Sequence, residues 1–276
     1  MRATVTALNV HPVKSCRAVA TARADVTPNG LALSGVRDRE WMIVDSQGRF
    51  LTQRELPALA LIEVAIAGGK TTLAIPGHGA IAPHADGPAC DVRVWSADVR
   101  GLDGGDAAAR ALSAYLGRPV RIVRFDDSHP RRVNPQYAGE GVTTLYADGY
   151  PVLVIGQASL DNLNERLRQR GANPVPMNRF RPSIVIDGLD PHDEDHVETI
   201  AIGDVVLRPV KPCTRCEITT TDQDSDRRSD EPLLTLSSYR HDPRLAGVTF
   251  GMNAIVAQGA GSTIGVGDKA QVAFRF

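Results

Sequence analysis

Apolar and polar residues alternate over short segments in the first half of the chain, and turn-forming residues separate these segments. A period of two places the apolar side chains on one face of a strand, so each segment is predicted to be a β-strand. The clearest examples are residues 4–10, 22–27 and 41–44. Residues 46–48 (SQG) predict a tight turn after the third strand, with residues 49–52 returning as the second strand of a hairpin.

One helix is predicted in this half of the chain, where an alanine-rich segment follows an acidic residue. Asp106 is positioned to cap residues 107–116, and Gly117 stands where a glycine typically ends a helix. The pattern changes after this helix. A domain boundary is therefore predicted within residues 118–127, which divides the chain into domains of residues 1–122 and 123–276.

The second half contains one clear amphipathic helix. Ser159 is predicted as its N-cap, Leu160, Leu163 and Leu167 share one face, and Gly171 ends it. Strands are predicted on both sides of this helix, as in the first half. The further predicted strands are residues 59–66, 71–75, 152–155, 183–186, 199–202, 205–209, 217–221 and 271–276. Short strands with frequent Gly and Pro between them favour a β-rich α+β fold with closed or nearly closed barrels over a doubly wound sheet.

Composition narrows the class of protein. The chain has 276 residues and a formal net charge of −1, which suits one large or two modest domains and gives no indication of nucleic-acid binding. The N-terminus alternates like a strand and lacks the apolar core of a secretory signal. No segment approaches the roughly 20 apolar residues that a membrane-spanning helix needs. The sequence therefore predicts a soluble, cytoplasmic protein without a membrane or nucleic-acid partner.

Cysteine is the residue type with the most informative placement. Four cysteines are too few for a disulfide scaffold in a chain of this length, and two of them form the pair Cys213 and Cys216. A structural zinc site would need further ligands such as His192 or His241. A redox dithiol normally opens a helix, whereas residues 217–221 predict a strand. Two packed thiols without chemistry remain a third possibility.

Basic residues near the pair favour another role. Arg215 lies between the two cysteines and Lys211 precedes them, so the setting is electropositive and favours a thiolate. A thiolate is a good ligand for a soft metal centre. By contrast, the charged run at residues 192–196 (HDEDH) is interpreted as a solvated loop and not as a metal cluster.

Several separated motifs occur in the order found in one protein family. The chain resembles MOSC-domain proteins that carry an added N-terminal β-barrel domain, in particular the amidoxime-reducing components and their bacterial counterparts. The matching segments are residues 11–16 (HPVKSC), 35–41 (GVRDREW), 178–182 (NRFRP), 213–222 (CTRCEITTTD), 231–236 (EPLLTL) and 250–253 (FGMN). The resemblance implies two β-barrel-like domains with a few helices, a MOSC N-terminal barrel followed by a MOSC domain.

The resemblance also assigns roles to residues. It implies that Cys216 is the protein ligand of molybdenum in a molybdenum cofactor (Mo-molybdopterin), and it gives Cys213 no role. The residues that it places around the cofactor supply cations or short hydrogen-bonding groups, which suit a phosphate-bearing pterin. They are Lys14, Ser15, Arg39, Arg181, Thr214, Arg215 and Asn253. Residues 148–151 (DGYP) are expected at a barrel mouth, where backbone N–H groups could face the cofactor.

The activity that the resemblance implies is reduction of the N–O bond of small N-hydroxylated compounds. Asp222, just beyond the strand predicted after the ligand, is the carboxylate predicted to relay protons and to be catalytic. Electrons are expected from a separate donor, which could be a ferredoxin, a flavin reductase or a b-type cytochrome. Two alternatives stay open: a non-catalytic carrier of the cofactor or of sulfur, and a zinc-stabilised binding module. Arg17 and Asn253 depart from the residues of some relatives, so substrate preference is not carried over from them.

Overall fold

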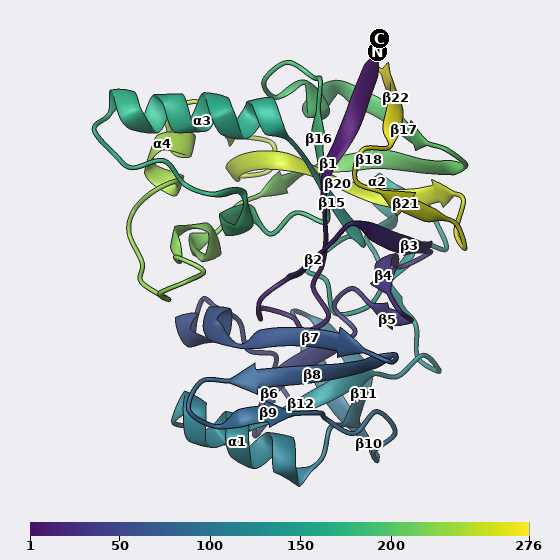
Figure 1. Ribbon diagram of the computed structural model, residues 1–276, viewed down its shortest axis with the longest axis vertical. Helices are drawn as coiled ribbons and strands as arrows, with labels where there is room; N and C mark the ends of the chain where they lie inside the picture. The colour runs from purple at the N-terminus through teal and green to yellow at the C-terminus, as the bar shows by residue number, and fades with distance from the viewer. Residues whose placement is uncertain (276) are drawn as a thin grey trace.

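The computed structural model describes residues 1–275, so the last residue of the strand predicted at 271–276 lies outside the described residues. The fold is β-rich, with four α-helices in the described part of the chain. Figure 1 shows a barrel with helices α3 and α4 beside it, and a second group of sheets with α1 below it. The predicted β-rich α+β class with two barrel-like parts is confirmed.

Seven strands close into a barrel. Their order around the barrel is β15, β16, β1, β22, β17, β18 and β20, and β20 pairs with β15 to complete the ring. Only the β15–β16 pair of this ring is parallel. The strands are β1 (Arg2–Val10), β15 (Val152–Gly156), β16 (Ile184–Asp187), β17 (Val197–Ile202), β18 (Val205–Thr214), β20 (Gly247–Gln258) and β22 (Lys269–Phe274).

The first strand belongs to this barrel although all six other strands of the ring come from beyond residue 150. Strand β1 lies between β16 and β22, and the amino group of Met1 donates a hydrogen bond to the carbonyl oxygen of Val272 at 2.8 Å. The start of β1 therefore lies beside β22, as Figure 1 shows. The alternating burial pattern of β1 is the one that the sequence predicts, with Val5, Leu8 and Val10 buried in the barrel core. The division at residue 122 stays a proposal about the order of domains along the chain.

A small sheet extends the barrel. It has the order β21, β3, β4, β5, and Ala24, Val26 and Leu31 from it complete the same core as the barrel strands. The short strand β2 (Val19–Thr21) pairs with β1, and β19 (His241–Asp242) pairs with β20. The sheet comprises β3 (Arg23–Thr27), β4 (Gly30–Leu33), β5 (Val36–Arg37) and β21 (Thr263–Gly265).

The remaining N-terminal segment forms the lower group of sheets in Figure 1. One sheet has the order β10, β11, β12, β6, and a second has the order β7, β8, β9. Helix α1 (Asp106–Leu116) packs on this part through Ala108 and Leu112. The strands are β6 (Trp41–Asp45), β7 (Glu63–Ala67), β8 (Lys70–Ile75), β9 (Gly79–Ile81), β10 (Ala89–Val94), β11 (Ala97–Asp103) and β12 (Val120–Phe125).

The ends of α1 follow the prediction in part. Gly117 ends the helix in the left-handed conformation, at φ 66°, which confirms its predicted role. Asp106 is instead the first helical residue, because Gly105 takes the N-cap position and no side chain caps the helix. The carboxylate of Asp106 accepts from Nη2 of Arg121 at 2.9 Å.

Helix α3 (Gln157–Gln169) starts earlier than predicted. Gly156 is its N-cap, and Ser159 lies inside the helix, where its hydroxyl donates to the Glu194 carboxylate at 2.7 Å. Leu160, Leu163 and Leu167 are buried along one face, as predicted. Glu194 is only 1% exposed, so the segment 192–196 is wrongly interpreted as a fully solvated loop.

The strand predicted at 217–221 and the first residues of the strand predicted at 59–66 are helical turns in the structure, whereas residues 63–66 lie in β7 as predicted. Residues 59–61 belong to the 3-10 helix η1 (Pro57–Leu61), and the segment after Cys216 forms η4 (Glu217–Thr220). The second strand of the hairpin predicted at 49–52 is reduced to single bridges from Arg49 and Phe50.

The other short elements lie around the barrel. They are β13 (Arg131–Arg132), α2 (Pro135–Ala138), β14 (Thr143–Thr144), η2 (Met177–Phe180), η3 (Asp193–His196) and α4 (Leu233–Ser237). Within residues 1–275, no helix has the length and apolar character needed to cross a membrane.

Candidate functional site

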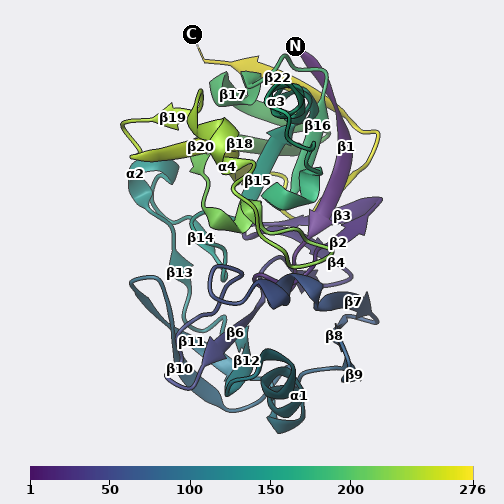
Figure 2. The same cartoon turned by 90° about the vertical axis from the view of Figure 1, so that its left-hand side faces the viewer.

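The candidate site is a polar pocket between the barrel and the lower group of sheets. Its lining comes from two distant parts of the sequence, residues 14–54 and residues 147–253. The inner part has a volume of about 130 Å³, and it adjoins a wider outer chamber of about 590 Å³. Figure 2 shows the strands β13 and β14 passing between the two groups of elements, and residues of β13 line the outer chamber.

The inner pocket brings together most of the residues singled out in the sequence. The predicted metal ligand and every predicted cofactor residue line it; they are Lys14, Ser15, Arg39, Arg181, Thr214, Arg215, Cys216 and Asn253. Asp148, Gly149 and Tyr150, from the predicted barrel-mouth segment, line it as well. Asp222 is absent from this lining.

Cys216 stands just beyond the end of β18, in extended conformation, and is followed at once by η4. The cation that contacts its sulfur is Arg54, whose Nη2 donates to Sγ at 3.2 Å. Arg215, which the sequence places beside both cysteines, instead donates from Nη1 to Sγ of Cys213 at 2.9 Å. Each thiol therefore has its own guanidinium partner, and the partner of Cys216 comes from a segment 162 residues away.

Lys14 follows β1 and is buried, with 5% exposure. Its Nζ donates to the carbonyl oxygen of Tyr146 at 2.8 Å and to the Asp148 carboxylate at 2.5 Å. Burial lowers the pKa of Lys14, while Asp148 acts in the opposite direction. Asp148 also accepts a hydrogen bond from Nε1 of Trp95 at 3.2 Å.

Three residues of the site have a backbone conformation that is uncommon for a side chain with a Cβ atom. Ser15, Arg39 and Arg181 have φ angles of 69°, 50° and 56°. Such conformations cost free energy and persist where surrounding contacts fix them. The contacts are present here, since the Arg39 N–H donates to the His11 carbonyl oxygen at 2.6 Å. The backbone thus aims these side chains into the pocket.

The pocket holds more positive charge than its own carboxylates neutralise. Lys14, Arg39, Arg54, Arg181 and Arg215 line it, whereas Asp148 is its single lining carboxylate. Behind the lining, Asp38 pairs with Arg39. Burial and the charge of Arg39 lower the pKa of Arg181 to about 10.

Unpartnered donors show which ligand would fit. Within the described residues, three buried guanidinium nitrogens of the lining have no hydrogen-bond acceptor: Nη1 of Arg54, Nη2 of Arg181 and Nε of Arg215. Buried donors without acceptors are costly, so they indicate a ligand rich in acceptor oxygens. An anionic, phosphate-bearing cofactor next to a thiol ligand satisfies these requirements.

Asp222 lies behind the turn that follows the ligand. Its carboxylate accepts from Nη2 of Arg179 at 2.9 Å, and Nη1 of Arg179 donates to the carbonyl oxygen of Thr220 at 2.9 Å. The hydrogen bond from Ser225, together with the charge of Arg179, lowers the pKa of Asp222. The predicted proton relay by Asp222 stays a prediction, and the geometry gives this residue a part in holding η4.

Sequence reasoning missed three residues that shape the site. Arg54 and Trp95 come from the N-terminal part, in segments without a recognisable motif, and the Arg54 guanidinium carbon lies 4.8 Å from the Trp95 ring centroid. The carboxylate of Asp148 was overlooked because only backbone groups were expected from its segment. Trp95 lies in the short turn between β10 and β11, where a single aromatic residue carries no specific signal in the sequence.

The zinc alternative finds no support in the geometry. Within residues 1–275, no group of three or more His, Cys, Asp and Glu side chains is arranged to hold a metal ion. His192 packs instead against Tyr239 and Phe250, and His241 lies in β19.

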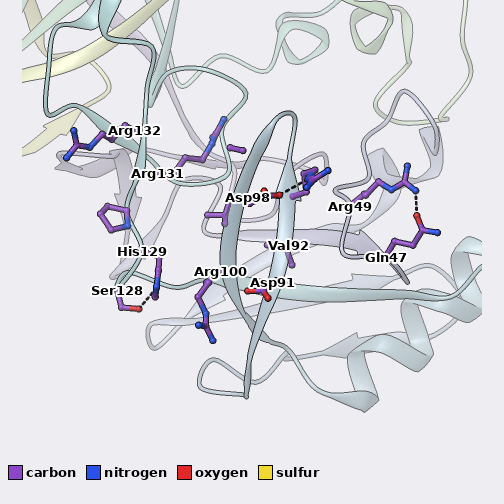
Figure 3. Close-up of a pocket in the computed structure, with 14 residues that line it drawn as sticks. Gln47, Arg49, Asp91, Val92, Asp98, Arg100, Ser128, His129, Arg131 and Arg132 are labelled. Carbon is purple, nitrogen blue, oxygen red and sulfur yellow. Dashed lines mark hydrogen bonds and ion pairs between the residues drawn. The ribbon is translucent and has the colours of Figure 1, made fainter.

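A larger groove of about 1060 Å³ lies along the β10–β11 hairpin, and Figure 3 shows it. It contains neither cysteine of the pair. Its basic residues are partly satisfied by neighbours, as in the Arg93 Nε to Asp98 hydrogen bond of 2.7 Å. Arg131 and Arg132 line both this groove and the outer chamber of the candidate site.

Comparisons with known proteins place two family domains along the chain. The MOSC N-terminal beta barrel domain matches residues 2–119, and the MOSC domain matches residues 142–271. The chain is 36% identical over 252 residues to mitochondrial amidoxime-reducing component 1 of Mus musculus, covering 86% of this chain and 71% of the relative. It is also 36% identical over 251 residues to mitochondrial amidoxime-reducing component 1 of Homo sapiens, covering 87% of this chain and 73% of the relative. Mitochondrial amidoxime reducing component 2 of Rattus norvegicus is 36% identical over 250 residues, with 86% and 72% covered.

Proposed function

We propose a molybdenum-cofactor-dependent oxidoreductase activity for this chain, which belongs to the family that joins a MOSC N-terminal beta barrel domain to a MOSC domain. Its reaction would be the reduction of the N–O bond of N-hydroxylated compounds. Similarity to amidoxime-reducing components over most of the chain supports an oxidoreductase of this kind. The single observation that carries the proposal is the pocket in which the Cys216 thiol lies among five cations, three guanidinium nitrogens of which lack an acceptor among residues 1–275.

Residues of both parts of the chain would hold the cofactor. Its anionic groups would be bound by the cations and short polar residues of the inner pocket, and Cys216 would ligate the metal. The cofactor residues proposed are Lys14, Ser15, Arg39, Arg181, Thr214, Arg215 and Asn253. When bound, the cofactor supplies the two-electron redox chemistry at molybdenum.

The chain itself contributes orientation and charge. The hydrogen bond from Arg54 holds the Cys216 sulfur in position to bind the metal. Asp148 and the Tyr146 carbonyl fix the Lys14 ammonium at the edge of the pocket, where it can bind an anionic oxygen. The net reaction converts an N–OH group to N–H and consumes two electrons and two protons while releasing water. The electrons are proposed to come from a separate donor, a ferredoxin, a flavin reductase or a b-type cytochrome.

The experiment measures molybdenum, zinc and oxidised-pterin fluorescence in protein made in a molybdate-supplied host, followed by benzamidoxime reduction with an artificial reductant. Wild type should contain molybdenum and pterin near stoichiometry and form benzamidine. Cys216→Ala should lose the metal and the activity. Cys90→Ala is the matched control, because that cysteine lies in β10 outside the pocket. Zinc without pterin in wild type, or full molybdenum in Cys216→Ala, would contradict the proposal.

A second candidate function is a carrier of the cofactor or of sulfur. The contact between Arg215 and Cys213 favours it, since this places a second thiol with its own cation in the same pocket. A carrier would bind the cofactor, and Cys213→Ala or Cys216→Ala would abolish its transfer of cofactor or sulfur. It would not turn over benzamidoxime. Benzamidoxime turnover therefore separates the two functions.

A further inference from the structure

The outer chamber has a lining of its own beyond the cofactor pocket. Trp95, Arg132 and Lys211 line the chamber of about 590 Å³ and are not part of the inner lining. Cys216 and Asn253 line both spaces, so the chamber opens directly onto the proposed metal ligand. It is therefore the space through which a substrate would reach the metal.

One side of the chamber presents a fixed aromatic ring. Trp95 is 47% exposed, which makes it one of the few large apolar side chains exposed in the described residues. It does not move freely, because its Nε1 donates to Asp148 at 3.2 Å and Arg54 lies against its ring. A rigid, partly exposed indole ring is suited to pack against a planar group of a ligand.

The charge of the chamber is positive and not balanced from within. Among residues 1–275, neither Arg132 nor Lys211 forms an ion pair. The Lys211 ammonium lies 4.9 Å from the centroid of the Tyr137 ring, in a cation–π contact. The single carboxylate of the lining, Asp148, is engaged by Lys14. Arg131 is occupied with the carbonyl oxygens of Leu145 and Ala147, at 2.9 and 2.6 Å. Two cations thus remain for a ligand.

We propose that the outer chamber selects N-hydroxylated compounds that combine a planar body with a carboxylate or another anionic oxygen group. Trp95 packs against the planar body, and Arg132 and Lys211 bind the anionic group, while the N–OH group faces Cys216. The inference deepens the proposed function and rests on it. It assigns the specificity to residues of the chain that are not part of the inner lining.

Binding is measured first, on cofactor-loaded protein without reductant, so that no turnover occurs. Titration with 4-carboxybenzamidoxime, benzamidoxime and its 4-trimethylammonio derivative is followed by tryptophan fluorescence. Trp95 is the reporter, because the other tryptophan, Trp41, is 3% exposed, and Trp95→Phe should remove the signal. The carboxylated compound should bind about tenfold more tightly than benzamidoxime at low salt, and the advantage should shrink as salt increases.

The variant Arg132→Gln/Lys211→Met should lose this preference. Its matched control is Arg110→Gln/Arg118→Gln, which removes two exposed charges remote from the chamber and should keep it. With reductant present, the ratio of kcat/KM for the carboxylated and the neutral compound should follow the binding ratio.

Three outcomes distinguish the proposed selectivity of the outer chamber from the proposed reductase activity on which it rests. Equal binding of the carboxylated and neutral compounds, or a preference that survives in Arg132→Gln/Lys211→Met, overturns the inference even when both compounds are reduced. Preferential binding with no reduction of either compound overturns the proposed function but keeps the charge selectivity of the chamber. Preferential binding and reduction, both lost in the variant, support the two together.

Discussion

At the scale of single residues, the pairing of Arg54 with Cys216 is the contact on which the site depends most. Arg54 also lies against Trp95 and 3.9 Å from Asp148, so one guanidinium connects the thiol, the aromatic ring and the carboxylate. We expect Arg54→Leu to reduce retained molybdenum several-fold, because the Cys216 sulfur loses the guanidinium group that contacts it and holds it in position. Elemental analysis after gel filtration measures this, with Arg110→Leu as the control. Full retention in Arg54→Leu would show that the contact is dispensable.

A second residue-scale prediction concerns His11, which is 1% exposed beneath the site. Burial, with the charges of Arg39 and Arg181, lowers its pKa from 6.5 to about 3. The unfolded chain therefore binds a proton below pH 6.5 that the folded protein binds only near pH 3, so stability falls as pH falls through this window. From pH 7 to pH 5 the loss from this one group is about 2 kcal/mol.

Urea denaturation at pH 7 and pH 5 tests this, by comparing wild type with His11→Gln. The variant should lose less stability than wild type between the two pH values, by about 2 kcal/mol. His192, whose pKa burial lowers to about 4, is present in both proteins and cancels in the comparison. Equal pH dependence in the two proteins would mean that His11 is not buried in its neutral form.

At the scale of elements, the turn η4 that follows Cys216 orients the side chain of this proposed metal ligand. Arg179, itself buried, holds this turn through the Thr220 carbonyl and is in turn paired with Asp222. Asp222→Asn separates a positioning role from a proton relay. An amide can still accept from Arg179, so we expect kcat to fall less than about tenfold and the pH profile to keep its shape, whereas loss of a relay costs about 100-fold or more.

Arg179→Met is the companion variant, because it removes the contact to the turn and leaves Asp222 in place. It should lower cofactor retention more than Asp222→Asn does. A pH profile that shifts in Asp222→Asn, with retention unchanged in Arg179→Met, would instead assign the relay to Asp222.

Local sequence patterns predict some of the helices and strands and miss others. Strand β1 and helix α3 were predicted because their apolar periods directly reflect which side faces the core. The turn at 217–220 was missed, since β-branched residues favour a strand and only tertiary contacts such as those of Arg179 override that preference. Ser159 was misplaced for a similar reason: its hydroxyl serves a buried Glu194, which local sequence does not disclose.

At the scale of the whole molecule, the site exists only because two distant parts of the chain meet. The ordered motifs located the residues of the inner pocket, but they gave no information on what lies across from them, so Arg54 and Trp95 were not foreseen. Such partners are set by how the β10–β11 hairpin and the segment 52–54 approach the barrel. The contacts between the two parts of the chain therefore form the site together with the motif residues.

The Gln53–Gln223 pair is the clearest test of that dependence. The two buried amides exchange hydrogen bonds of 3.0 and 2.9 Å across the interface, and Gln53 also donates to the Ser15 carbonyl oxygen at 2.7 Å. A double-mutant cycle with Gln53→Ala and Gln223→Ala should give a coupling of about 1 kcal/mol in the free energy of unfolding. Each single variant should also retain less molybdenum, because Gln53 donates to the Ser15 carbonyl oxygen and directly precedes Arg54 in sequence. Gln157→Ala in α3 should change neither quantity, since it loses only a solvent-exposed hydrogen bond to Asp161. If the interface variants lose stability but keep the cofactor, the two parts of the chain meet without shaping the site, and the residues of the barrel alone must hold the cofactor.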